Sequence, residues 1–91
     1  MHAVVVKVSV QDDGTSRKYL QENIVPGVSQ APGFVAGYWV RLEGGDEGNS
    51  VVVFESEEAA RAAAEQIRER VDSNPGVTIK DVSVGEVIAN A

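Results

Sequence analysis

The hydrophobic periodicities of strands and of helices alternate along this 91-residue chain, and their order is compatible with few folds. Every second residue from Val4 to Val10 is a valine, and period two with β-branched side chains predicts a strand. Residues 15–29 then carry apolar side chains at intervals of four, which is typical of one face of a helix. Because proline interrupts helical hydrogen bonding, Pro26 is expected to end this helix near Ile24 or to let it resume only as a short irregular turn.

A β-hairpin is predicted in the middle of the chain. Strand patterns at residues 34–42 and 51–55 flank the polar, glycine-rich segment 44–49. Strict alternation in the first of these strands predicts that even-numbered residues share one face and odd-numbered residues the other. By this reasoning Val35, Gly37, Trp39 and Arg41 point together, opposite to Phe34, Ala36, Tyr38, Val40 and Leu42.

A second helix and a last strand complete the pattern. Ser56 can cap a helix that stops at residues 74–76, Asn-Pro-Gly. The last strand, residues 77–88, changes its apolar phase midway, which predicts a bulge near Lys80-Asp81. The apolar stripe of the helix is expected to contain Ala60, Ala63, Ala64, Ile67 and Val71.

The order strand, helix, strand, strand, helix, strand predicts a single α+β domain over residues 1–91. Right-handed crossovers give a ferredoxin-like βαββαβ sandwich: a four-stranded antiparallel sheet in the order 4-1-3-2, with both helices on one face.

The helix-free face of this sheet is expected to be apolar. Ala3, Val5, Val35 and Trp39 fall on it, together with either Val51 and Val53 or Val52 and Phe54. A contiguous apolar sheet surface marks an interface or a ligand site. We therefore expect a homodimer in which two sheets pair face to face and enclose a barrel-like interior.

Composition narrows the functional classes. Fourteen acidic against eight basic residues give a net charge of −6, which disfavours nucleic acid as a partner. The chain has no cysteine and one histidine, so thiol chemistry and the common transition-metal sites are not expected. With no apolar run of about 18 residues and no leader pattern, a cytoplasmic location away from membranes is predicted.

Two segments carry a resemblance to a known family. The stretch Pro32–Trp39, PGFVAGYW, and the run Val53–Ala60, VFESEEAA, resemble the dimeric α+β barrel superfamily, and within it the antibiotic biosynthesis monooxygenase-like proteins. The resemblance implies a homodimer with one pocket per subunit between sheet and helices. Members include cofactor-free, quinone-forming monooxygenases, haem-degrading enzymes and proteins without an assigned activity.

The chain also departs from that family. Enzymatic members often carry tryptophan where this chain has Phe54, and haem-degrading members carry a histidine on the following helix, where this chain reads Ala62–Glu65, AAAE. Haem degradation is therefore disfavoured, and no cofactor is expected.

Six residues are candidates for binding a ligand. Trp39 and Tyr38, which point to opposite faces, could stack on a flat aromatic molecule, and Arg41 could hold an anionic or carbonyl group. On the first helix, Tyr19 and Asn23 lie four residues apart and could orient a substrate. The candidates are Trp39, Tyr38, Asn23, Arg41, Tyr19 and, as a base near the chain start, His2.

Each candidate also has a structural interpretation. The aromatic residues can serve core packing, Arg41 can form a cross-strand ion pair, and His2 can be a surface residue. Three functions follow: a dimer binding a small apolar or aromatic ligand, a cofactor-independent monooxygenase on a phenolic or quinol substrate, or a non-catalytic dimerisation or regulatory module. Whether the protein is an enzyme is left open by the residues.

Overall fold

The computed structural model describes residues 1–70 and 74–91, so the expected apolar position Val71 lies outside the described residues. No helix of the described part is long and apolar enough to span a membrane. The elements, in chain order, are β1 (His2–Val10), α1 (Asp13–Tyr19), a π-helical segment η1 (Leu20–Ile24), α2 (Val25–Ser29), β2 (Phe34–Arg41), β3 (Glu47–Phe54), α3 (Glu57–Glu69) and β4 (Val77–Glu86).

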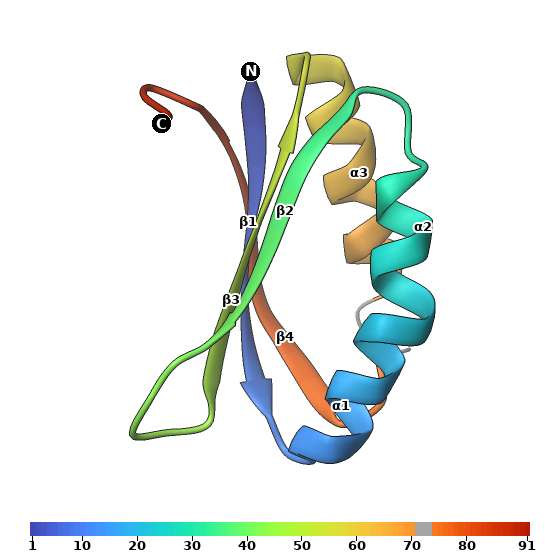
Figure 1. Cartoon of the computed structure of the whole chain (residues 1–91), viewed down its shortest axis with the longest axis vertical. Coiled ribbons are helices and arrows are strands. Elements are labelled where there is room, and N and C mark those ends of the chain that lie inside the picture. Colours follow the sequence, from blue (N-terminus) through green and yellow to red (C-terminus); the bar gives the residue numbers. More distant parts are fainter. Residues whose placement is uncertain (71–73) are drawn as a thin grey trace.

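The four strands form one antiparallel sheet in the order β2-β3-β1-β4. This is the expected order 4-1-3-2 counted from the other edge, so the ferredoxin-like prediction is confirmed. Both helical layers lie on the same face of the sheet, and the opposite face carries none (Figure 1).

The bulge predicted in the last strand is present at Lys80. Lys7 pairs with Asp81, whereas the next residue, Val8, pairs with Ile79, so Lys80 is the extra residue in β4. The extra residue restores the apolar phase, because Ile79 and Val82 now both pack against the core on the helix side.

A second bulge, in β2, was not predicted and changes which side chains share a face. Phe34 pairs with Phe54, but Ala36 pairs with Val53, so Val35 is the extra residue. The alternation therefore breaks at Val35, and Phe34 and Trp39 both pack against the core on the helix side. The prediction that Val35 and Trp39 lie together on the helix-free face was wrong.

The first helix does not end near Ile24; of the two alternatives expected at Pro26, the helix resumes, as the short element α2 that runs to Ser29, and its irregular turn lies before the proline. The π-helical segment explains the difference. The Val25 N–H bonds to the Leu20 carbonyl, five residues back, and Pro26 sits in the first turn of α2. A wider turn directly before proline accommodates the missing donor and the ring, which an unbroken α-helix does not.

The core is asymmetric. Its fully buried side chains come from the sheet (Val4, Val6, Val52 and Phe54) and from α3 (Ala60 and Ala64). By contrast, none of α1, η1 or α2 contributes a buried residue. One half of the space above the sheet is therefore closely packed, and the other half, beneath the first helix, is not.

The helix-free face is apolar over three of its four strands. Its exposed members include Tyr38, Val40 and Val51, at 66%, 51% and 38% exposure. On β4 the same face is polar, with Asp81 and Ser83. The strand register assigns to the apolar part, called the helix-free patch below, Ala3, Val5, Ala36, Tyr38, Val40, Val51 and Val53.

Candidate functional site

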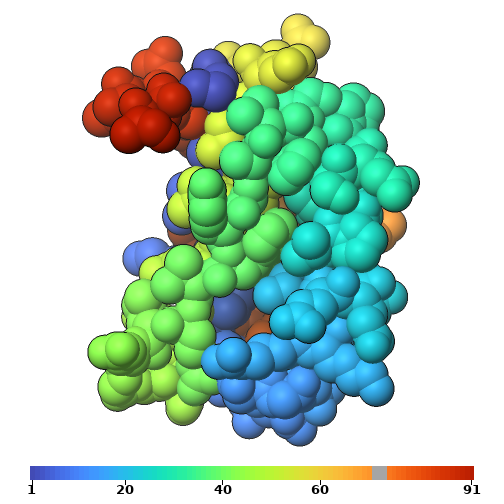
Figure 2. All heavy atoms as spheres, viewed as in Figure 1, coloured from blue at the N-terminus to red at the C-terminus, as the bar shows by residue number. Residues whose placement is uncertain are grey.

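A cavity of about 590 Å³ lies between the sheet and the first helix. The alternate valines of β1, Val4 to Val10, line its floor, and Ala63 and Ile67 of α3 line one side. Figure 2 shows the molecular surface hollowed between β2, in green, and α1, in blue. This volume falls within the range of small-molecule sites, and its lining is mostly apolar.

The π-helical segment explains how one helix lines so much of the cavity. Two rows of side chains with a spacing of four residues face it. In a regular α-helix of 3.6 residues per turn, rows with that spacing would rotate progressively away from the cavity. One wider turn takes up an extra residue and brings both rows back into line. The rows are Ser16, Leu20, Ile24 and Val28, and Tyr19, Asn23, Gly27 and Ala31.

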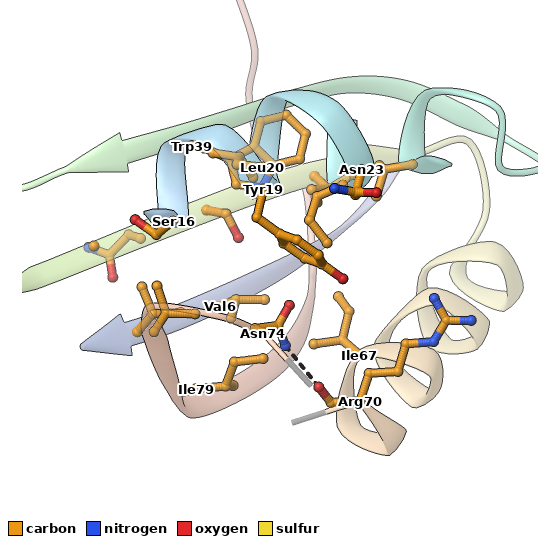
Figure 3. Close-up of a pocket in the computed structure, with 18 of the residues that line it drawn as sticks. Val6, Ser16, Tyr19, Leu20, Asn23, Trp39, Ile67, Arg70, Asn74 and Ile79 are labelled. Atoms are coloured by element: carbon orange, nitrogen blue, oxygen red, sulfur yellow. Dashed lines mark hydrogen bonds between the residues drawn. The ribbon is translucent and has the colours of Figure 1, made fainter. Parts of the chain in front are cut away.

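Tyr19 and Asn23 place polar groups at the cavity from the helix side. Figure 3 shows the ring of Tyr19 projecting from the helix toward Ile67 of α3, while Asn23 lies one turn farther along. Tyr19 is half-buried, and Asn23 is exposed at the cavity edge. A phenol hydroxyl can donate and accept, and an amide can do both at separate atoms, so the pair can orient a polar group of a ligand.

Trp39 lines the cavity from the sheet side. Its indole lies directly over Gly37: a Cβ atom added to that glycine would be 2.8 Å from Cη2 and 3.0 Å from Cζ3 of Trp39. Gly37 and Trp39 are two residues apart on the same face of the strand. Because Gly37 has no side chain, the indole has room to lie against the backbone. The tryptophan therefore presents its ring to the cavity while it also packs against the core.

Arg41 joins the end of β2 to the start of α1 at one end of the cavity. Its guanidinium forms a close ion pair with Asp13 and donates to the Gly45 carbonyl at 3.2 Å. Asp13 also forms an ion pair with Arg17, whose Nε lies 2.7 Å from the Asp13 Oδ2. The expected ion-pair role of Arg41 is therefore present, but its partner is on a helix, not on a neighbouring strand.

Two of the six candidate residues do not reach the cavity. Tyr38 points from the opposite face of the sheet and is 66% exposed, as part of the helix-free patch. His2 pairs with Phe54 and Glu86 at the far end of β1. The structure thus brings together Trp39, Tyr19, Asn23 and Arg41.

Polar residues of α3 and of the chain after it also line the cavity and were not predicted from the sequence. Gln66 lines it from α3, Arg70 from the C-cap of that helix, and Asn74 from the turn before β4. The Asn74 amide donates to the Arg70 carbonyl at 2.8 Å, and the Arg70 side chain extends from the helix end alongside α3 (Figure 3). In sequence, Arg70 reads as part of the charged, solvent-facing side of a helix, so no signal distinguishes it.

Two carboxylates at helix starts have pKa values below their ordinary values. The hydrogen bond from the Arg61 guanidinium, 2.8 Å long, lowers the pKa of Glu57, and the charge of Arg61 adds to the effect. At the start of α1, the Thr15 N–H lowers the pKa of Asp12, whose carboxylate accepts it. Both carboxylates stabilise the positive end of a helix, Asp12 as the N-cap of α1 and Glu57 in the first turn of α3.

No protein-family profile and no curated protein matches the sequence. Solved structures do match the fold. SnoaB, a cofactor-independent oxygenase from Streptomyces nogalater, superposes with a TM-score of 0.73 at 14% identity, over 98% of this chain and 94% of that chain. The ActVA-Orf6 monooxygenase of Streptomyces coelicolor, in complex with nanaomycin D, has a TM-score of 0.64 at 20% identity, over 98% and 92%.

A third similar structure is a dimeric ferredoxin-like protein from an uncultured marine organism, with a TM-score of 0.63 at 13% identity over 100% and 98% of the two chains. At these identities the comparisons establish the fold. The chain has the fold of the antibiotic biosynthesis monooxygenase-like, dimeric α+β barrel proteins, as its sequence resemblance predicted.

Proposed function

We propose that this protein is a homodimer whose subunits each bind a small aromatic or apolar ligand in the cavity beneath the first helix. The cavity itself, about 590 Å³, carries the proposal. A module that serves only to join two copies has no use for an open interior, and it would gain stability by filling that space. An apolar floor with a few converging polar groups is the usual character of a ligand site.

The lining residues suggest how such a ligand is held. A flat ring can stack on the indole of Trp39, with the β1 valines beneath it. Tyr19 and Asn23 approach from the helix and can bond to a hydroxyl or carbonyl at the ring edge. The apolar floor supplies affinity, and the two polar side chains supply orientation.

Intrinsic fluorescence offers a direct test, because Trp39 is the single tryptophan in the chain. Titration with naphthol or an anthrone should quench its emission to saturation. Asn23→Ala and Tyr19→Phe should weaken binding, since each removes a hydrogen-bonding group from the cavity. Tyr38→Phe makes the matched change outside the cavity and should leave affinity unchanged; equal effects of Tyr19→Phe and Tyr38→Phe would contradict the site.

The helix-free patch supports the homodimer. Its exposed valines and Tyr38 would be covered by the same patch of a second copy related by a two-fold axis. Pairing of this kind buries about 800 Å² on each copy in a standard interface. The similarity to a dimeric ferredoxin-like protein adds support.

A second candidate function is oxygenation of the bound ligand without a cofactor, favoured by the similarity to SnoaB and the ActVA-Orf6 monooxygenase. In this reaction a ring carbon bearing two hydrogens is oxidised to a carbonyl by dioxygen; one oxygen atom enters the product and the other leaves as water. Trp39, Asn23 and Arg41 would orient the ionised phenolic substrate.

Oxygen uptake separates the two candidate functions. With an anthrone, a monooxygenase consumes one dioxygen per quinone formed, and Asn23→Ala or Trp39→Phe should abolish that consumption. Saturable quenching without oxygen uptake would leave ligand binding as the function.

A further inference from the structure

The charge of the cavity is opposite to that of the whole protein. The chain carries a net charge of −6. Yet among the described residues that line the cavity, the charged ones are a single acid, Asp13, and three bases, Arg17, Arg41 and Arg70. Their sum is +2. A ligand entering the cavity therefore meets a local positive field on a protein that is otherwise acidic.

The one acid among the described residues of the cavity lining is already compensated. Asp13 pairs with Arg41 through Oδ1 and with Arg17 through Oδ2, so both of its oxygens face guanidinium groups. Arg41 uses a further N–H on the Gly45 carbonyl. A guanidinium offers five N–H donors, so these three contacts leave donors of Arg17 and Arg41 for another acceptor.

These basic groups lie at the edge of the cavity, where the ends of a ligand bound in its apolar interior would be. Arg17 and Arg41 come from α1 and the end of β2, the two elements on either side of the opening in Figure 2. Arg70 lies at the end of α3, on the side toward which Tyr19 projects in Figure 3. The valine floor and Trp39 occupy the interior between them. Apolar surface inside and donors at the edge suit a molecule with an apolar body and a charged end.

We infer that the ligand of this cavity carries an anionic group, a carboxylate, a sulfonate or an ionised phenol, on its ring system, and that the arginines at the cavity edge select it. The inference rests on the proposed ligand-binding function and specifies its chemistry. Charge-assisted hydrogen bonds from guanidinium to an oxyanion supply the selection.

Two fluorescent probes with the same ring skeleton test the selection. Anilinonaphthalene sulfonate carries an anionic group, and phenylnaphthylamine is the same molecule without it. The sulfonate should bind about fivefold more tightly despite the net charge of the protein, and its advantage should shrink as salt is added. Displacement by naphthoate and by naphthol then distinguishes a carboxylate from a phenol as the preferred group.

Arginine substitutions locate the effect. Arg17→Gln and Arg70→Gln should each weaken binding of the sulfonate about threefold and leave binding of the neutral probe unchanged. Arg61→Gln is the matched control, since Arg61 is an exposed arginine of α3 that pairs with Glu57 and does not line the cavity. It removes the same charge from the protein and should affect neither probe.

The outcomes separate this inference from the function on which it rests. If the neutral probe binds as tightly as the sulfonate and the arginine substitutions change nothing, the anionic preference is overturned, while apolar ligand binding stands. If Arg61→Gln weakens the sulfonate as much as the cavity variants do, the attraction belongs to the whole surface and the inference also fails. If neither probe binds, both proposals are overturned.

Discussion

Gly37 determines where the indole of Trp39 can lie. The two residues share one face of β2, and the ring occupies the space that a side chain at position 37 would take. Glycine weakens a strand interior, because it has no side chain to pack. Here it allows the largest side chain of the cavity to lie against the backbone and leave the remaining volume open.

Replacing Gly37 with alanine should move Trp39. The new methyl group would come within 2.8 Å of the ring, so the indole must rotate toward the cavity. Stability should fall by only about 1 kcal/mol, since the far end of one side chain can yield. The tryptophan emission maximum should shift and ligand quenching should weaken, as measured by fluorescence and chemical unfolding.

Gly85 provides the control for this change. It lies on β4, and nothing is within 4 Å of an added Cβ atom. Gly85→Ala should leave the tryptophan spectrum and ligand affinity as they are. If Gly37→Ala behaves in the same way, the indole is not held against Gly37 in solution.

At the scale of single residues, the sequence identified Trp39, Tyr19, Asn23 and Arg41 as candidates, but its strict alternation assigned Trp39 to the wrong face of the sheet. The extra residue in β2 is Val35, a β-branched residue that is ordinary in a strand and gives no sign of a bulge. Arg70 was missed for a similar reason: its role comes from the end of a helix lying beside a cavity, which periodicity does not show.

Among the elements, the π-helical segment accounts for two features of the first helix that a regular α-helix does not accommodate along its whole length. Apolar residues recur at intervals of four, which drift on a 3.6-residue turn, and Pro26 lies inside the same pattern. A single wider turn accounts for both. The β4 bulge was easier to predict, because Lys80 interrupts a visible alternation of apolar residues.

Inserting one alanine after Glu22, an exposed residue of η1, should add a residue beyond the one that the wider turn already takes up. Residues before the insertion would then rotate by about 100° relative to those after it, carrying Tyr19 away from the cavity. Ligand quenching should be lost while the circular dichroism spectrum keeps its helical and strand signals. Glu22→Ala, which keeps the chain length, should bind as the parent does; equal binding by the insertion variant would contradict this role.

The cap of α1 makes a pH-dependent contribution to stability. Asp12 accepts the Thr15 N–H at 3.0 Å, which lowers the pKa of its carboxyl below the ordinary value of 3.8. Because the folded pKa is the lower one, the ionised cap stabilises the protein above pH 3.8, and this contribution is lost as the pH falls through the folded pKa. Asp12→Asn should therefore lose less stability between pH 7 and pH 3 than the parent.

Urea unfolding at the two pH values measures this difference. Glu69→Gln, at the last residue of α3, removes a carboxylate away from the α1 cap and serves as the control for a change in net charge. An Asp12→Asn variant with the same acid sensitivity as the parent would show that the cap does not contribute as described.

For the whole molecule, the order of elements determined the sheet topology, and the two faces of the sheet differ in what covers them. The helix side buries the core against α3, and the other side leaves an apolar surface over three strands. Helices can cover only one face, so the sequence pattern of both faces predicts that surface. The sequence of one chain does not identify the partner that covers this surface, because a second copy of the chain has the same sequence and adds no further pattern.

Val51 tests the proposed pairing, since it lies within the helix-free patch and is 38% exposed. Val51→Lys would place an unpaired charge at the centre of the interface, so the dimer should dissociate. Sedimentation should give twice 9.7 kDa for the parent and 9.7 kDa for the variant. Gln30→Lys adds the same charge on the helix side and should remain dimeric; a parent of 9.7 kDa at micromolar concentration would refute the pairing.

The first helix encloses the cavity without contributing a buried residue to the core. Apart from Val28, which packs against the core, substitutions along its inner side should therefore cost little folding free energy, because they neither empty nor overfill closely packed space. Substitutions there can change the lining of the cavity while the sheet and α3 keep the protein folded. Sequence differences among proteins with this architecture should accordingly concentrate in the helix that covers the cavity.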